Sequence, residues 1–186
     1  MTSQRAAPGA KIETALLAAS LSPNRVRKVG AVLVAHDGTE IAACNSFPAG
    51  IRDLEDRHVG DGRFVWMEHA ERRAIFEAAR RGVSTAGAHL TTTFFPCIDC
   101  ARAIVEAGLA CLDTPAPDFD DLVWGASFER SQVILREGGV EIRIIEAAVR
   151  SYDEDAGALE REDGGRSLTP PSPDFPQPSR LALKVW

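Results

Sequence analysis

The amino-acid sequence predicts an α/β protein in which helices cover both faces of one mixed sheet of about five strands. Near the start, two apolar segments flank turn residues at 36–39, as in an antiparallel hairpin. Further on, β-rich segments alternate with segments of helical periodicity, and a helical crossover joins neighbouring strands in parallel. The last two strands, at 109–112 and 140–145, flank a helix and are therefore expected to run parallel.

The first half of the chain predicts a helix, the hairpin and a long loop. Apolar residues recur at helical spacing within residues 10–21, and Pro23 lies just beyond them. The hairpin strands are expected at 29–35 and 40–45. Residues 46–66 lack periodicity and contain several Gly and Pro residues, so we expect a long functional loop there.

The second half alternates helices and strands. Apolar residues from 68 to 81 follow one helical face, and Gly82 is placed to end that helix. The later expected elements are a strand at 89–95, a helix at 96–108, a strand at 109–112, a helix at 127–137 and a strand at 140–145. A Pro- and Asp-rich insertion and a short apolar segment at 122–124 separate the last two units.

Composition indicates one globular domain and a tail. With 186 residues, 45% hydrophobic and 26% charged, the chain suits a domain at 1–150 followed by an acidic and then Pro-rich tail at 151–186. No segment approaches the roughly 18 apolar residues of a membrane span, and no export signal is evident, so we expect a cytoplasmic protein without membrane binding. The net charge of −6 disfavours nucleic acid as a partner.

Two short motifs at expected helix starts contain metal-ligand side chains, His-Ala-Glu at 69–71 and Pro-Cys-Ile-Asp-Cys at 96–100. Cysteines three apart lie on one face of a helix, so Cys97 and Cys100 can reach one ion together with His69. A helix N-terminus favours the thiolate form that binds metals. Three protein ligands leave zinc one open position, so the sequence predicts a catalytic Zn²⁺ site.

Glu71 is the expected catalytic residue. Lying two residues after His69, it points roughly 200° around an ideal helix and is not expected to bind the same ion. We expect Glu71 to take a proton from the activated water and deliver it to the ring nitrogen of an aminated nucleobase, whose amine then leaves as ammonia.

Other uses of these motifs stay open at this point. A lone Cys-x-x-Cys also occurs in redox and structural zinc sites, whereas the two motifs together seldom coincide by chance. A structural zinc site is one alternative. Another is a noncatalytic, zinc-stabilised interaction module that presents its Pro-rich tail to a partner.

The similarity to a known family extends beyond these motifs. It includes Ser22-Pro23-Asn24, Val29-Gly30-Ala31, Asn45-Ser46-Phe47-Pro48-Ala49-Gly50, and Phe95-Pro96-Cys97 through Ile104 to Gly108. Over roughly residues 12–145 the chain resembles the deoxycytidylate (dCMP) deaminase family of the cytidine-deaminase-like superfamily. The resemblance implies the three-layer α/β/α cytidine-deaminase-like fold, a homo-oligomer and a pyrimidine nucleotide substrate.

The resemblance also implies substrate contacts. Asn45 is expected near the sugar, the backbone N–H of Ala70 on the base carbonyl, and the loop at 48–50 over the site. Phe47 and Pro96, which lie within the same motifs, complete the expected pocket.

Loop arginines and departures from the family pattern bear on the substrate. Arg25 and Arg52 are candidates for binding a 5′-phosphate through bidentate hydrogen bonds, although ordinary solvated surface is the alternative for each. The family usually has Asp at the position of Ser22 and Asn at the position of Arg73. Its tyrosine-containing strand is replaced by Cys111 and the Pro-rich insertion, so contacts to the base are expected to differ there.

The leading prediction is hydrolytic deamination of dCMP, or of a related deoxycytidine nucleotide, to the uracil product. The alternative is the same chemistry on a nucleoside, a free nucleobase or another aminated heterocycle. A tRNA adenosine deaminase uses the same motifs, but the acidic composition disfavours a polyanionic partner.

Overall fold

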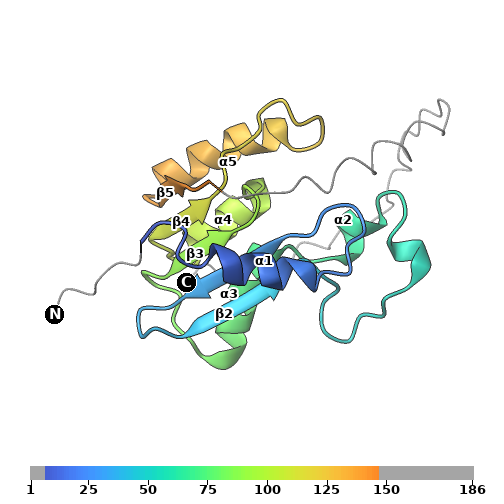
Figure 1. Ribbon diagram of the computed structural model, residues 1–186, viewed down its shortest axis with the longest axis horizontal. Helices are drawn as coiled ribbons and strands as arrows, with labels where there is room; N and C mark the ends of the chain where they lie inside the picture. Colours follow the sequence, from blue (N-terminus) through green and yellow to red (C-terminus); the bar gives the residue numbers. More distant parts are fainter. Residues whose placement is uncertain (1–6, 147–186) are drawn as a thin grey trace, which may run out of the picture. The chain divides into compact units, whose positions relative to one another are not determined.

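A computed structural model describes residues 7–146. The elements are α1 (Ile12–Ser20), β1 (Gly30–Val34), β2 (Glu40–Cys44), the 3₁₀ turn η1 (Glu55–Arg57), α2 (Gly62–Trp66), α3 (Ala70–Arg81), β3 (His89–Thr92), α4 (Ile98–Glu106), β4 (Cys111–Thr114), α5 (Gly125–Glu137) and β5 (Glu141–Ile144). The strands form one sheet in the order β2-β1-β3-β4-β5 (Figure 1).

The sheet is mixed, as the sequence predicted. β1 and β2 form an antiparallel hairpin whose register pairs Gly30 with Cys44 and Val34 with Glu40. β1 also pairs antiparallel with β3, whereas β3, β4 and β5 run parallel to one another. The parallel pairing of the last two strands is therefore confirmed.

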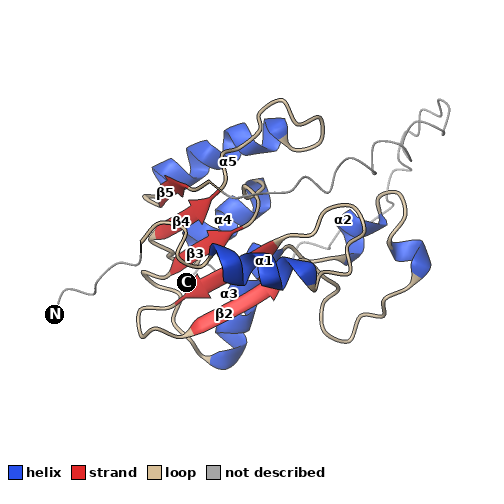
Figure 2. Ribbon diagram, in the orientation of Figure 1, coloured by secondary structure: helices blue, strands red, loops and turns tan. Residues whose placement is uncertain are grey.

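Helices cover both faces of the sheet, which confirms the three-layer prediction. α1 packs on the strands of the hairpin and on β3, while α3 lies on the opposite face (Figure 2). One cluster of buried side chains joins Leu33, Leu90 and Leu112 of the sheet to residues of α3, α4 and α5. The starts of α3 and α4 therefore lie on the same side of the sheet.

Gly30 lets α1 approach the sheet closely. A Cβ at this position would lie 1.9 Å from the backbone oxygen of Ala15 and 2.7 Å from the backbone nitrogen of Ala19. Only a residue without a side chain fits there, since real Cβ atoms do not come so close to backbone atoms.

Two expectations about elements were wrong in detail. Residues 46–66 were expected to be a loop throughout, but they contain η1 and the five-residue helix α2, which is too short to show helical periodicity. The helix expected from residue 68 begins only at Ala70, because His69 is extended, with φ −71° and ψ 150°. It ends as expected, at Gly82 with φ +66°.

Within residues 7–146, no helix has the length and apolar character needed to cross a bilayer. The expected tail at 151–186 lies outside the described residues, so the division into a domain at 1–150 and a tail stays a prediction.

Candidate metal centre and active site

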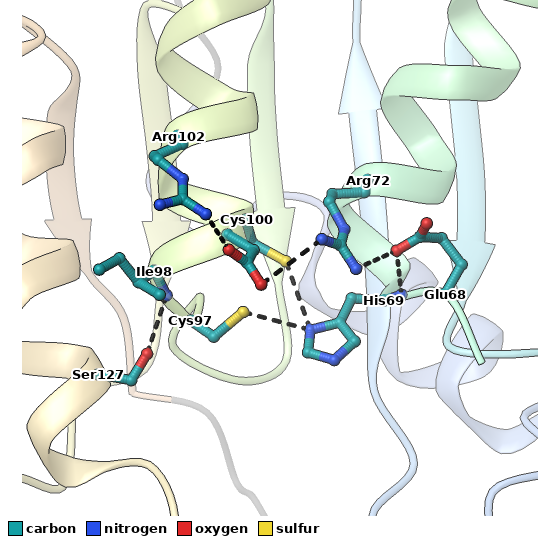
Figure 3. Close-up of polar contacts among 9 residues, drawn as sticks. Glu68, His69, Arg72, Cys97, Ile98, Cys100, Arg102 and Ser127 are labelled. Atoms are coloured by element: carbon teal, nitrogen blue, oxygen red, sulfur yellow. Dashed lines mark hydrogen bonds and ion pairs between the residues drawn. The ribbon is translucent and has the colours of Figure 1, made fainter. Parts of the chain in front are cut away.

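Three metal-ligand side chains meet where α3 and α4 begin. His69 directly precedes α3, Cys97 directly precedes α4, and Cys100 lies in the first turn of α4. The Nδ1 atom of His69 is 3.4 Å from the Sγ atom of Cys97 and 3.4 Å from that of Cys100 (Figure 3). All three ligand atoms lie within 4.8 Å of one another.

This spacing fits a zinc ion. In a tetrahedral site with Zn–S of about 2.3 Å and Zn–N of about 2.0 Å, nitrogen and sulfur are about 3.5 Å apart. The two nitrogen–sulfur distances of 3.4 Å match that separation. The donors are also of the types that zinc prefers, and three of them leave one position for a water or substrate.

The backbone places these side chains differently from the prediction. His69 and Cys97 are both N-cap residues with extended backbone, so neither lies inside its helix. The 200° separation of His69 and Glu71 on an ideal helix therefore does not describe their directions. Cys97 and Cys100 meet because an N-cap side chain can reach the third residue of the first turn.

Glu71 lies beside the three ligands and is almost completely buried, with 3% of its surface exposed. Burial raises the pKa of its carboxyl group, while the charge of His69 acts in the opposite direction. A buried carboxyl group with a raised pKa beside an imidazole is a candidate for proton transfer.

The two thiols and the imidazole shift one another's pKa values. The hydrogen bond with Cys100 is the largest cause that lowers the pKa of Cys97, to about 4. The same bond, together with burial, raises the pKa of Cys100. Burial alone would lower the pKa of His69, but its hydrogen bond to Cys97 and the charge of Glu71 outweigh burial and raise it. One thiolate is thus stabilised before any metal binds.

Further side chains around the ligands were not foreseen from the sequence. Glu68 accepts a hydrogen bond from the backbone nitrogen of His69 at 3.0 Å and forms an ion pair with Arg72. Ser127, in the first turn of α5, accepts a hydrogen bond from the backbone nitrogen of Ile98 at 2.9 Å (Figure 3). Glu68 and Arg72 carry the i,i+4 pattern of a helical ion pair, but no local signal marks Ser127.

A second group of ligand-type side chains, His89, Cys111 and Asp113, lies on β3 and β4. Arg143 donates to both carboxylate oxygens of Asp113, at 2.6 Å and 3.0 Å, and its Nη2 atom is 2.9 Å from the Nε2 atom of His89. The backbone N–H of Gly9 also donates to Asp113, at 2.7 Å. Because a guanidinium inside this group repels a cation, we assign the candidate metal centre to the first group.

Asn45, expected near a substrate sugar, is buried and holds the segment between α1 and β1. Its Oδ1 atom accepts hydrogen bonds from the backbone nitrogen of Val29 at 2.8 Å and from the hydroxyl of Ser22 at 2.7 Å. Its Nδ2 atom donates to the backbone oxygen of Arg27 at 2.9 Å. The structure thus gives Asn45 a scaffolding role that the sequence did not predict.

Three of the other expected substrate contacts, Phe47, Ala70 and Pro96, are buried. Phe47 is buried, and its carbonyl accepts a hydrogen bond from Arg73 at 2.9 Å. Ala70 is buried as the first residue of α3, where a backbone N–H has no partner within the helix. Pro96 is buried immediately before Cys97.

The two expected phosphate-binding arginines are exposed. Both terminal nitrogens of Arg25 face the carboxylate of Glu55, one of them at 2.7 Å. Arg52 accepts a hydrogen bond at its backbone oxygen from Arg57, at 2.8 Å. The contacts described for Arg25 and Arg52 do not join either side chain to His69, Cys97 or Cys100.

A three-layer α/β/α fold with His, two Cys and a buried Glu at the starts of two helices defines a class of enzyme, the hydrolytic deaminases that cleave the C–N bond of an amine. Residues 9–112 match the family described as the cytidine and deoxycytidylate deaminase zinc-binding region, and the chain belongs to this family.

Several relatives support this assignment. The chain is 30% identical over 131 residues to the "uncharacterized deaminase in luxG 3'region" of Aliivibrio fischeri, which covers 70% of this chain and 87% of that protein. It is 42% identical over 67 residues to the deoxycytidylate deaminase of enterobacteria phage T4, covering 33% and 35% of the two chains.

A solved structure shares the fold. The dCMP deaminase of cyanophage S-TIM5, in complex with dCMP and dUMP, is similar with a TM-score of 0.59 at 26% identity. The similarity covers 73% of this chain and 94% of that one.

Proposed function

We propose that the chain is a zinc-dependent deaminase that converts dCMP, or a closely related deoxycytidine nucleotide, to the uracil product and ammonia. The observation that supports this most strongly is the meeting of His69, Cys97 and Cys100 beside the buried carboxyl group of Glu71. The first three supply a metal-ligand set with one open position, and the fourth supplies a proton carrier.

The zinc ligands in this proposal are Nδ1 of His69 and the sulfur atoms of Cys97 and Cys100. A zinc ion bound there supplies the Lewis acidity that activates water for attack on the carbon bearing the amine. Glu68 and Ser127 support the ligands from outside, since each accepts a hydrogen bond from the backbone beside one of them.

Glu71 carries the protons. Its carboxylate takes a proton from the attacking water and gives it to the ring nitrogen next to the amine-bearing carbon. A second proton then goes to the departing amine, so that water and the aminated ring become a ring carbonyl and ammonia. We assign the backbone N–H of Ala70, which as the first residue of α3 has no partner within the helix, to the carbonyl oxygen of the base.

Support for a pyrimidine nucleotide comes from the relatives and from one part of the fold. The phage T4 relative is a deoxycytidylate deaminase, and the S-TIM5 structure contains dCMP and dUMP. In this chain Asn45 holds Ser22, Val29 and Arg27 around the end of β2. Its second amide hydrogen is the group that we assign to the substrate sugar. We also propose self-association, which the family resemblance implies.

An unphosphorylated substrate is the second candidate, and the state of Arg25 favours it. The guanidinium of Arg25 pairs with Glu55 through both terminal nitrogens. A phosphate group would have to compete with that carboxylate for the same donors. A nucleoside, a free nucleobase or another aminated heterocycle makes no such demand.

The test is ammonia release by zinc-loaded protein from dCMP, CMP, deoxycytidine, cytosine, guanine and adenosine. Glu71→Gln keeps the size of the side chain and removes its proton-carrying function, so turnover should fall by about 10²- to 10⁴-fold while zinc content stays the same. Glu77→Gln is the matched control, because Glu77 lies on the same helix and pairs only with Arg80 and Arg81 among the described residues.

Each outcome decides between the candidates. Preference for dCMP supports the nucleotide proposal, and preference for deoxycytidine or a base replaces it with the second candidate. Full activity of Glu71→Gln contradicts the assigned proton carrier. Silence of the wild-type protein on all six compounds, with zinc bound, would contradict the nucleotide proposal and favour a noncatalytic module.

A further inference from the structure

Trp124 lies between β4 and α5 and places an aromatic ring against His69 of the candidate metal centre. Its ring is 5.7 Å from that of His69 between centroids, with the planes inclined at 75°. It makes a second edge contact with Phe64 of α2, also at 5.7 Å. Trp124 is partly buried, unlike its two preceding neighbours Leu122 and Val123, which are exposed.

The insertion before α5 is built to hold Trp124 in this position. Oδ1 of Asp121 accepts hydrogen bonds from the backbone nitrogens of Val123 at 2.9 Å and Trp124 at 2.8 Å. The backbone oxygen of Asp121 accepts from Gly125 at 2.9 Å. A Cβ on Gly125 would lie 2.2 Å from the backbone oxygen of Phe119, so the turn closes only with glycine there.

The insertion is also tied to the segment that Asn45 holds. Arg27 forms an ion pair with Asp121 at 3.2 Å, and its guanidinium lies over the ring of Phe94, 4.3 Å from the centroid. Phe94 comes shortly before Cys97 in the chain. Arg27 therefore connects three segments: residues 22–29, the segment with Phe94 that precedes Cys97, and the turn that carries Trp124.

We propose that Trp124 is a specificity-determining residue whose indole forms one wall of the substrate pocket and packs against the aminated heterocycle. This inference rests on the proposed function, because it takes the ligand to be a planar base held beside His69. An aromatic side chain suits that ligand, since ring–ring contacts in offset or edge geometry are favourable and every base has a π face.

The path of the chain gives this assignment a reason. Cys111 begins the buried strand β4. The Pro- and Asp-rich insertion follows that strand and ends at Trp124. The aromatic wall thus reaches the site from the insertion, and Arg27 and Asp121 are positioning residues for it.

The test uses binding as well as turnover. Glu71→Gln protein loaded with zinc allows dCMP binding to be measured by calorimetry without turnover, and Trp124→Leu or Trp124→Phe is added to it. Leucine keeps apolar packing without a ring, and should weaken dCMP binding roughly 10-fold or more. Phenylalanine keeps a ring and should recover most of the affinity. Leu122→Ala, in the same insertion and fully exposed at 103%, is the control and should change nothing.

Zinc content and substrate choice separate a pocket wall from mere support of His69. We expect one zinc per chain in both Trp124 variants. In enzyme that keeps Glu71, Trp124→Leu should raise the KM for dCMP and reduce the preference in turnover for dCMP over the other compounds. The inference is overturned if Trp124→Leu binds dCMP as tightly as the Glu71→Gln protein to which it was added. It is also overturned if Trp124→Leu loses zinc but the molecules that still hold zinc bind dCMP with full affinity. If the parent binds none of the six compounds, the proposed function fails first.

A coupled variant tests the positioning role of Asp121. Asp121→Ala should weaken dCMP binding alone, and should add little to Trp124→Leu, because both changes remove the same wall. Independent, additive losses would show that Asp121 acts without Trp124.

Discussion

Replacing Asn45 by alanine removes the side chain that joins the end of β2 to the segment entering β1. The change deletes hydrogen bonds from Val29 at 2.8 Å and Ser22 at 2.7 Å, and one to the backbone oxygen of Arg27 at 2.9 Å. Asn45 itself is buried, with 7% of its surface exposed, so the vacated site is shielded from solvent.

The expected loss of stability follows from these bonds. Each hydrogen bond contributes about 1 kcal/mol net, and a buried group left without a partner costs about 1–3 kcal/mol. Val29 and Arg27 are only partly buried, so water can replace part of what is lost. We therefore expect the free energy of unfolding to fall by about 2–3 kcal/mol, which lowers Tm by about 4–12 °C in a protein of this size.

Denaturant unfolding followed by circular dichroism measures this loss. The experiment is run once with saturating zinc and once with a chelator, because metal binding adds its own free energy to the folded state. Asn45→Asp retains the oxygen that accepts from Val29 but sets a second acceptor against the backbone oxygen of Arg27, so it should also destabilise the fold. Ser20→Ala, which removes an exposed hydrogen bond to Leu17, should stay within about 0.5 kcal/mol. A value for Asn45→Ala within that same range would refute the reasoning.

Two further changes probe the frame of the site. Gly30→Ala should destabilise the fold by about 3 kcal/mol or more in a thermal melt, because the added Cβ would lie 1.9 Å from the backbone oxygen of Ala15. Gly38→Ala is the control and should cost only about 1 kcal/mol, because no atom lies within 4 Å of its Cβ. Equal losses in the two variants would contradict the close approach of α1 to the sheet. Ser127→Ala removes the acceptor of the Ile98 N–H at 2.9 Å and should weaken zinc affinity about 10-fold in a competitive chelator titration with little change in Tm, so unchanged affinity would count against support of Cys97 by α5.

Most of the fold could be predicted because its signals are local. The apolar segments around the turn at 36–39 predicted the hairpin, and the register that pairs Val34 with Glu40 follows from that turn. Strand-helix-strand order predicted the parallel strands β3, β4 and β5. The helix α2 was missed because five residues are too few for a periodic signal. Its first residue, Gly62, and the nearby turn residues Gly50 and Gly60 indicated a loop instead.

The meeting of His69, Cys97 and Cys100 could also be predicted, because these residues lie in two short motifs with the spacing of metal ligands. Asn45 was singled out, but its scaffolding role was not, because its partner Ser22 lies 23 residues away. Trp124 was not foreseen beside His69, since only tertiary packing joins residues that far apart and a lone tryptophan after an insertion carries no motif. Local patterns thus located the candidate ligands and Glu71, whereas the side chains packed around them depend on the completed fold.

The site also explains an unusual feature of the two helices that form it. An N-cap side chain normally accepts a hydrogen bond from the first turn, and losing that bond costs about 0.5–2 kcal/mol per helix. His69 and Cys97 occupy the N-cap positions of α3 and α4, yet neither side chain caps its helix, because both are turned toward the shared centre. At the start of α3, the backbone N–H of Ala70 has no partner within the helix. A zinc ion held by such ligands would contribute on the order of 10 kcal/mol, which would offset the lost caps several times over. The same geometry that weakens the two helix starts therefore supplies both the ligands and the donors that the proposed deamination needs.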